Sequence, residues 1–241
     1  MTTDYPIIVG VGQKTYHPGG SEATPSPLEM MEGVAREAER DAGAAGLLAK
    51  LDSVRVVNIM SWPSADPPAD LAARLGAGDG ERGYSTVGGN TPQWLVNDTA
   101  EAIARGNTRL ALLVGGEAVY TVREARKRNE MPQWEELGRP KANLGDRRRG
   151  FSDMELKYGG HLPIRSYPLF ENAIRAHHGW TMDEHVRQIS ELAAGFAAVA
   201  KDNPHAWFRD GKSATEIGTT TPVNRMICFP YTKFLNAIME V

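Results

Sequence analysis

The sequence contains one cysteine, no long hydrophobic run and almost no excess of either charge. The single cysteine, Cys228, excludes an internal disulfide framework and a cysteine-rich metal site. The 27 basic and 30 acidic side chains give a formal net charge of −3, so no overall field attracts nucleic acid or an anionic membrane. No stretch approaches the roughly 18 apolar residues of a membrane span, and no signal peptide is visible. We therefore expect a cytoplasmic protein without nucleic-acid or membrane partners.

Motifs for nucleotide and metal binding are also missing. Gly10-Val11-Gly12 lacks the third glycine of a dinucleotide fingerprint, and no Walker A sequence occurs. The six histidines include no His-x-x-x-His spacing, so we expect no metal site. His185 stands alone and is expected at the surface. His161, in a constrained Gly-Gly-His-Leu-Pro loop, is the best candidate for a functional histidine, and a purely structural role stays open beside it.

What is present is an alternation of strand and helix signals over residues 1–120. Ser26-Pro27-Leu28-Glu29 combines a capping box with proline at the first helical position, and Thr91-Pro92 opens another helix in the same way. Alternation of this kind predicts a mostly parallel sheet with helices on both faces. Short apolar runs predict the strands, at Ile7–Gly12 (buried), Val54–Met60, Tyr84–Val87 and Leu110–Val114, with a further helix at Pro67–Leu75.

After Tyr120 the chain becomes polar and dense in charge up to residue 162. Its basic cluster Arg147-Arg148-Arg149 is either a solvated surface or a rim for an anionic ligand such as a nucleotide phosphate. Thr181-Met182-Asp183-Glu184 is a second capping box, and it opens a long helix with an apolar stripe. The apolar end of the chain includes Cys228, which is expected to pack as a small hydrophobe rather than to act as a nucleophile.

Several of these segments resemble the N-terminal half of the thiolase superfamily. The order of strand Pro6–Gly12, helix from Ser26, strand Val54–Met60 and loop Ser85–Asn90 is similar to the family's N-terminal domain. Asp98–Gly106 followed by Leu112–Glu117 looks like its nucleophile helix and the next strand, and Tyr167–Ala173 with Trp180–Glu184 looks like its loop domain. The sterol-carrier-protein type of thiolase and its bacterial thiolase-like relatives are the most similar.

The resemblance implies an α/β fold, with a mixed sheet between helices and a helical loop-domain insertion. The domains it implies are 1–120 for the N-terminal α/β domain, 121–222 for the loop domain with a polar insert, and 223–241 for a segment returning to the first sheet. It also implies an acyl-CoA-handling protein of lipid metabolism, either an acyltransferase of the acetyl-CoA acetyltransferase type or a carbon–carbon lyase. The coenzyme A thioester is then a substrate, and no cofactor is covalently bound.

Thr91 stands at the position that matches the family's nucleophilic cysteine. A hydroxyl is a far weaker nucleophile than a thiol with a pKa of about 8.5. Thr91 also fits a helix N-cap, and we expect its hydroxyl near the amides of Gln93 or Trp94. His161 is the second catalytic candidate. The candidates for the nucleotide end of coenzyme A are Arg147, Arg148, Arg149 and Tyr167.

The family's basic histidine and its second cysteine come from a C-terminal half that this sequence does not contain. We expect a complementary chain or the rest of a longer protein to supply that half. We also expect a homodimer through the edge strand Tyr84–Gly89, because an open edge leaves backbone groups bare. The rival function is a non-catalytic CoA-binding scaffold or partner subunit of a thiolase-like complex. A different α/β enzyme is a third interpretation.

Overall fold

A computed structural model describes residues 5–17, 25–62, 64–132, 134 and 138–221 of the chain. The chain forms two compact units, Met1–Arg147 and Arg148–Val241, each with its own architecture. The predicted return segment 223–241, with Cys228, lies outside the described residues.

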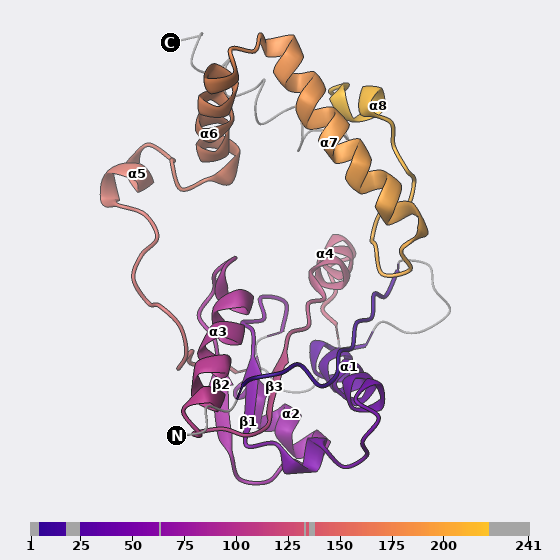
Figure 1. The fold of residues 1–241 in the computed structure, drawn as a ribbon, viewed down its shortest axis with the longest axis vertical. Helices are drawn as coiled ribbons and strands as arrows, with labels where there is room; N and C mark the ends of the chain where they lie inside the picture. Colours follow the sequence, from indigo (N-terminus) through magenta and orange to yellow (C-terminus); the bar gives the residue numbers. More distant parts are fainter. Residues whose placement is uncertain (1–4, 18–24, 63, 133, 135–137, 222–241) are drawn as a thin grey trace. The chain divides into compact units, whose positions relative to one another are not determined.

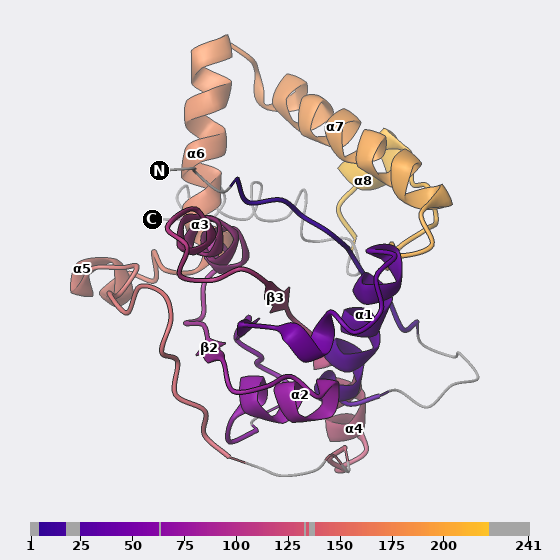
Figure 2. The ribbon, with the colours of Figure 1, turned by 60° about the horizontal axis from the view of Figure 1, so that its bottom comes forward.

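The first unit is built on a three-stranded parallel sheet (Figure 1). Strand β1 (Ser53–Val56) is central, with β2 (Glu81–Tyr84) on one side and β3 (Ala111–Val114) on the other, and Ser53 is in register with Glu81 and Ala111. Helix α3 (Thr91–Ala104) lies over one face of the sheet, and α1 (Pro27–Asp41) and α2 (Pro67–Leu75) lie over the other (Figures 1 and 2). This confirms the predicted α/β fold with a sheet between helices. The described strands pair only in parallel.

Helices α1 and α2 begin where a side chain can cap them. Ser26 and Glu29 form the expected capping box: the Ser26 hydroxyl accepts from the Glu29 N–H at 3.2 Å and the Glu29 carboxylate accepts from the Ser26 N–H at 2.7 Å. The Asp66 carboxylate caps α2. Helix α3 gives way to Gly106 in the left-handed conformation, at φ 75°. The first unit also contains a short 3₁₀ helix (Leu48–Lys50) and helix α4 (Val119–Lys127).

The core of the first unit lies between the sheet and helices α1 and α2. Every residue of β1 is buried, as expected for a central parallel strand covered on both faces. Met31 and Leu71 come from the two helices and are fully buried against Val54 and Val56 in the same cluster. The parallel sheet therefore depends on these helices for cover.

Two strand predictions are wrong in their bounds. Strand β1 ends at Val56, well before Met60, and the strand predicted at Tyr84–Val87 instead runs over Glu81–Tyr84. Strand β2 begins with the charged residues Glu81 and Arg82, so a search for apolar runs does not find its start. Beyond Tyr84 the chain is drawn toward a different neighbour, because the Thr86 N–H donates to the Leu144 carbonyl at 2.9 Å.

The prediction of a buried strand at Ile7–Gly12 is also wrong for the described structure. The segment belongs to no strand, and the Ile7 and Ile8 side chains are exposed. Its glycines lie directly on α1: a Cβ on Gly10 would stand 2.1 Å from the Ala38 carbonyl oxygen. The segment is therefore positioned by α1, while no strand lies beside it among the described residues.

Helices are the regular secondary structure of the second unit, as far as the structure describes it. It contains α5 (Asp153–Lys157), α6 (Pro163–His178), α7 (Met182–Asp202) and α8 (Ala214–Gly218). The capping box at Thr181 is confirmed as the start of α7. Helix α8 packs on α7, where Gly218 approaches the buried Ser190 so closely that an added Cβ would lie 2.9 Å from the Ser190 hydroxyl. No described helix is long and apolar enough to cross a bilayer.

The buried Met31 gives a direct test of this core. Its side chain is 0% exposed, so Met31→Ala leaves a cavity under the sheet and should lower the free energy of unfolding by about 2–5 kcal/mol. Met60, 71% exposed, is the matched control, and Met60→Ala should change it by less than about 0.5 kcal/mol. Urea titrations followed by circular dichroism measure both; equal losses would contradict the placement of Met31.

Candidate functional site

The candidate site of the first unit is the loop that follows β2 and the start of α3. Thr91 is the first residue of α3 and is buried, with Asn90 as N-cap. The Thr91 hydroxyl donates back to the Thr86 carbonyl at 3.3 Å, and the Thr91 N–H donates to the Gly88 carbonyl at 3.1 Å. The expectation that Thr91 caps the helix is therefore wrong. Because of the tight turn at Gly88, the N-cap position falls on Asn90, one residue before Thr91. The Thr91 hydroxyl stabilises the loop instead.

This loop is held to the ends of the neighbouring strands. The Asn58 N–H donates to the Ser85 hydroxyl at 2.9 Å, and the Asn58 side-chain amide donates to the Ser85 carbonyl at 3.1 Å. Ser85 is fully buried, and next to it the Thr86 N–H is bonded to Leu144. The carboxyl ends of β1 and β2 thus fix the turn from which α3 and Thr91 start.

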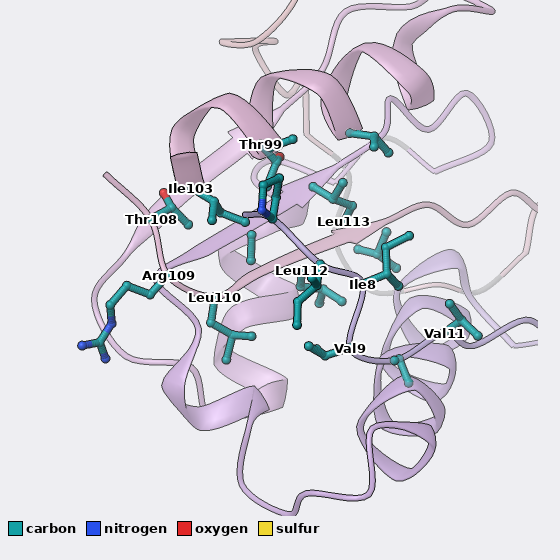
Figure 3. A pocket seen from close by; sticks show the side chains of 18 of the residues that line it. Ile8, Val9, Val11, Thr99, Ile103, Thr108, Arg109, Leu110, Leu112 and Leu113 are labelled. Carbon is teal, nitrogen blue, oxygen red and sulfur yellow. The ribbon is translucent and has the colours of Figure 1, made fainter. Parts of the chain in front are cut away.

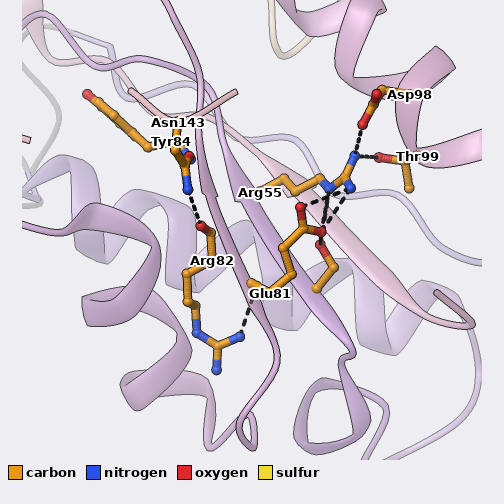
Figure 4. Close-up of polar contacts among 8 residues, drawn as sticks. Arg55, Glu81, Arg82, Tyr84, Asp98, Thr99 and Asn143 are labelled. Atoms are coloured by element: carbon orange, nitrogen blue, oxygen red, sulfur yellow. Dashed lines mark hydrogen bonds and ion pairs between the residues drawn. The ribbon is translucent and has the colours of Figure 1, made fainter. Parts of the chain in front are cut away.

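A buried arginine joins the sheet to α3 (Figure 4). The Arg55 guanidinium, on β1, donates to Asp98 at 2.7 Å and to the Thr99 hydroxyl at 2.9 Å, both on α3. It also forms an ion pair with Glu81 of β2 at 2.8 Å. A buried guanidinium needs such partners, because an unpaired charge in the interior is very costly. The network places α3, and with it Thr91, at a fixed position on the sheet.

The same network shifts the acidity of Glu81. Partial burial by itself raises the pKa of the Glu81 carboxyl, but hydrogen bonds from Ser53 and Arg55, with the charge of Arg55, outweigh it and hold the pKa below its ordinary value. Sequence reasoning missed this cluster, although one signal for it exists. A charged residue between Val54 and Val56, in the middle of an apolar strand, predicts buried partners.

The carboxyl ends of β1 and β3 meet at Glu117. Its carboxylate accepts the backbone N–H groups of Met60 at 2.5 Å and Ser61 at 3.2 Å. Nearby, the buried Tyr84 hydroxyl accepts the Ile59 N–H at 2.8 Å. Burial is the main reason that the pKa of Tyr84 is raised. The Glu117 carboxylate and the Tyr84 hydroxyl thus both bind backbone N–H groups, and they hold the loop after β1 in place.

The basic candidates Arg147, Arg148 and Arg149 are all exposed and lie at the division between the units. In the first unit, Arg147 donates to the Ala142 carbonyl at 2.5 Å. In the second unit, Arg149 forms an ion pair with Asp153 at 2.8 Å. Exposed guanidinium groups remain suited to phosphate, although Arg149 must exchange one carboxylate partner for it.

His161 and Tyr167 both belong to the second unit. The Nδ1 atom of His161 is buried without a hydrogen-bond partner, and its ring meets Phe151 edge-on at 6.0 Å between centroids. Tyr167 is exposed on α6. No hydrogen bond, ion pair or ring contact joins these two candidates in the described part of the chain. Thr91 belongs to the first unit, so the contacts of the three candidates are described separately for each unit.

The expectation that His185 lies at the surface is wrong. Its side chain is 1% exposed, and its Nε2 lies 2.8 Å from a carboxylate oxygen of Glu171 on α6. The Trp180 ring lies between it and His178, stacked on His178 at 4.2 Å. The contact between His185 and Glu171 joins α6 to α7. No local sequence signal predicts this contact, because Glu171 and His185 are 14 positions apart and lie on different helices.

Among the described residues, no three His, Cys, Asp or Glu side chains lie close enough together to hold a metal ion.

The Arg55 network should make stability depend on acid pH. Because the folded state lowers the pKa of Glu81 from its ordinary 4.5, its stabilisation is present above about pH 4.5 and is lost as the pH falls through the folded value. Glu81→Gln should therefore remove on the order of 0.5–1 kcal/mol at pH 7, discounted for solvent screening, and less below pH 4.

Denaturant titrations between pH 3 and 7 measure this difference. Glu101→Gln, on the exposed face of α3, is the control. A Glu81→Gln variant whose stability deficit stayed constant over that range would contradict the ionic role of Glu81.

Comparison with known proteins gives matches to solved structures alone. No model of a protein family matches the chain, and no curated protein does. A monomeric SCP2-thiolase-like protein type 1 (STLP1) from Mycobacterium smegmatis is 25% identical, with a TM-score of 0.66 over 91% of this chain and 40% of that one. The Ltp2-ChsH2(DUF35) aldolase is 18% identical, with a TM-score of 0.55 over 92% of this chain and 50% of that one.

The chain therefore spans two fifths to one half of the proteins that it matches. The small parallel sheet between helices is part of that match. The resemblance inferred from the sequence is confirmed: the chain is thiolase-like, and it corresponds to about one half of a protein of that kind.

Proposed function

We propose that this chain handles a coenzyme A thioester as one half of a thiolase-like protein, and that the complete protein works as a carbon–carbon lyase. The observation that carries the proposal is the structural match to STLP1 at 25% identity over 91% of the chain. The second match is an aldolase, which supports a lyase rather than an acyltransferase.

The surroundings of Thr91 argue against a covalent acyl-enzyme. Its hydroxyl is buried and donates to the Thr86 carbonyl, so its proton is engaged with a group that cannot remove it. No histidine or carboxylate makes a hydrogen bond to it among the described residues. A hydroxyl without an adjacent base is a poor nucleophile at neutral pH. Thr91 therefore shapes the loop, and a thioester would be activated by hydrogen-bond donors instead.

The lyase step that we propose is a retro-aldol cleavage of a 3-hydroxyacyl thioester. A base takes the proton of the 3-hydroxyl group, the bond between C2 and C3 breaks, and C3 becomes a carbonyl carbon. The electron pair forms an enolate at C2, which donors to the thioester oxygen stabilise, and C2 then takes a proton. The products are a free carbonyl compound and a shortened acyl-CoA. No oxidant and no acyl-enzyme is needed.

The residues proposed for the nucleotide end of coenzyme A are Arg147, Arg148, Arg149 and Tyr167. All four side chains are exposed, and the three arginines offer planar groups for phosphate. His161 is proposed as a group near the reacting end, since its buried Nδ1 has no hydrogen-bond partner. These roles follow from the resemblance and from the chemistry of the side chains.

A partner polypeptide is part of the proposal. In the second match, Ltp2 is paired with ChsH2(DUF35), which supports a complex with a different subunit. A homodimer through the Tyr84–Gly89 edge has less backbone to use, because Asn143 and Leu144 already bond to the Tyr84 carbonyl. STLP1 is described as monomeric. We therefore favour a complementary chain or segment over a second copy.

The alternative function is a CoA-binding scaffold without chemistry. It is favoured by the engagement of both the hydroxyl and the N–H of Thr91 within the loop, which leaves neither group for a substrate. A scaffold binds coenzyme A but turns over no thioester, so binding and turnover measured on the same complete protein separate the two functions.

The proposed function predicts how Thr91→Ala behaves in the complete protein. With 3-hydroxybutyryl-CoA, wild type should release acetaldehyde and acetyl-CoA, and Thr91→Ala should keep the rate within about tenfold, since it removes a loop contact and no nucleophile. With acetoacetyl-CoA and coenzyme A, wild type should show no thiolysis. Thiolysis that Thr91→Ala abolishes, with an acylated peptide in the mass spectrum, would show that Thr91 is the nucleophile after all.

A second prediction concerns coenzyme A binding. Replacing Arg147, Arg148 and Arg149 together by alanine should weaken binding at least about tenfold, because three phosphate partners are lost. The control replaces Arg123, Arg126 and Arg128, which carry the same total charge on another part of the chain. Isothermal titration calorimetry measures the affinity of each triple variant for coenzyme A. If the variant of Arg147, Arg148 and Arg149 bound coenzyme A as tightly as the control variant, these arginines would not belong to the site.

A further inference from the structure

The outer edge of β2 is covered by a segment of the same unit, residues 142–145, which we call the edge strap. Along a strand, successive residues direct their backbone groups to opposite sides of the chain. The Ser85 N–H donates inward to β1 at 3.0 Å, so the backbone groups of Arg82, Tyr84 and Thr86 point outward. Outward-pointing groups of an edge strand need partners or water.

The backbone of the strap bonds to two of these residues. The Asn143 and Leu144 N–H groups donate to the Tyr84 carbonyl at 2.9 Å and 3.1 Å. The Thr86 N–H in turn donates to the Leu144 carbonyl at 2.9 Å. Leu144 and Ser85 form a parallel bridge, so Leu144 takes the place of a residue in a neighbouring strand.

The side chain of Asn143 closes the rest of the edge (Figure 4). Its amide oxygen accepts the Tyr84 N–H at 2.7 Å, and its amide nitrogen donates to the Arg82 carbonyl at 2.8 Å. A side-chain amide carries the same donor and acceptor as a peptide group, so Asn143 continues the bridge where the backbone of the strap departs. From the Arg82 carbonyl to the Thr86 N–H, each outward backbone group of the edge is thus bonded to the strap.

Two glycines fit the strap to the strand. A Cβ on Gly83, in β2, would stand 2.3 Å from Cδ1 of Leu144, so the glycine leaves the space that the leucine side chain occupies. Gly145 has φ 94°, and a Cβ there would stand 2.4 Å from the Thr86 hydroxyl oxygen. A glycine inside a strand weakens it unless another part of the chain must come close. The two positions therefore indicate that the strap is a built feature of this edge.

The opposite edge of the sheet is different. Strand β3 borders a cavity of about 1040 Å³, which Leu112 and Leu113 help to line (Figure 3). Residues 5–12 lie on its far side. The chain thus covers the β2 edge with hydrogen-bonded backbone and leaves β3 beside a cavity.

We propose that the strap is an edge guard: it occupies the backbone groups of β2 and so keeps this edge from pairing with a strand of another polypeptide. An uncovered edge is a template for such pairing. A homodimer through Tyr84–Gly89 needs the same groups, so it forms only when the strap leaves. The strap competes well, because a segment of the same chain acts at a high effective concentration. The inference concerns assembly and does not rest on the proposed chemistry.

Hydrogen exchange in the complete protein tests whether the strap closes the edge. Asn143→Ala removes both side-chain bonds, so the Tyr84 amide should exchange at least about tenfold faster. The Ser85 amide bonds to β1 and should keep its rate. Asn107→Ala, exposed on the loop after α3, is the matched control and should change neither rate.

Mass spectrometry with electron-transfer fragmentation resolves the two adjacent amides. Equal acceleration at Tyr84 and Ser85 would show that Asn143 supports the fold in general and not the edge. An unchanged rate at Tyr84 would show that the strap does not close the edge. Either result overturns the proposal.

Sedimentation velocity of the complete protein tests the guarding itself. Gly145→Val should dislodge the strap, because valine avoids positive φ and its Cβ would meet Thr86. This variant should self-associate at least about tenfold more tightly than wild type. Adding Arg82→Pro should reverse the gain, since proline at an outward-facing position blocks strand pairing there without removing a bond to β1. Circular dichroism confirms that the variants are folded.

Asn143→Ala leaves the backbone of the strap unchanged and is the second variant for association, with a smaller gain expected. Two results would overturn the guard role. One is a variant that exposes the Tyr84 amide yet associates no more than wild type. The other is association that Arg82→Pro leaves unchanged, which would assign it to another surface. Coenzyme A takes part in neither measurement, so a failure of the proposed function stays separate from a failure of this inference.

Discussion

The buried guanidinium of Arg55 is the interaction on which the first unit depends. It stands on the central strand and binds Glu81 on the neighbouring strand and Asp98 on α3, so two layers of the fold are tied by one side chain. It fixes α3 on the sheet through Asp98 and Thr99, while the loop Ser85–Asn90 is held by its own bonds to Asn58 and Leu144. Removing both carboxylates would leave an unpaired charge in the interior, which costs far more than an ordinary surface ion pair contributes. The candidate site therefore depends on this network for the position of α3 and on the loop bonds for the position of Thr91.

Features decided by neighbours in the sequence were predictable. The capping boxes at Ser26 and Thr181 involve residues three positions apart, and both mark helix starts in the structure. The bounds of the strands were less predictable. Strand β2 begins with the charged Glu81, and its position is decided by pairing with β1. Thr91 shows the limit within a single turn. The sequence pattern fits an N-cap, but the turn at Gly88 moves the cap to Asn90.

The candidate site was predictable in kind rather than in detail. The thiolase-like resemblance followed from the order of segments, whereas the contacts of the site residues depend on tertiary structure. The pairing of His185 with Glu171 brings together side chains of two successive helices, and the engagement of the Thr91 hydroxyl requires the loop to close on Thr86. The roles of His161, Tyr167 and the three arginines remain predictions, since no contact in the structure decides them.

The parallel pairing of β1 with β3 has a consequence for synthesis of the protein. At translation rates of about 5–20 residues per second, β1 emerges several seconds before the strand that will lie beside it. During that interval an apolar strand with open edges is prone to pair with another nascent chain. Arg55 places a positive charge in the middle of that strand, and two copies aligned in parallel would bring like charges together. The residue that later anchors the folded sheet thus also opposes its aggregation while the chain is incomplete.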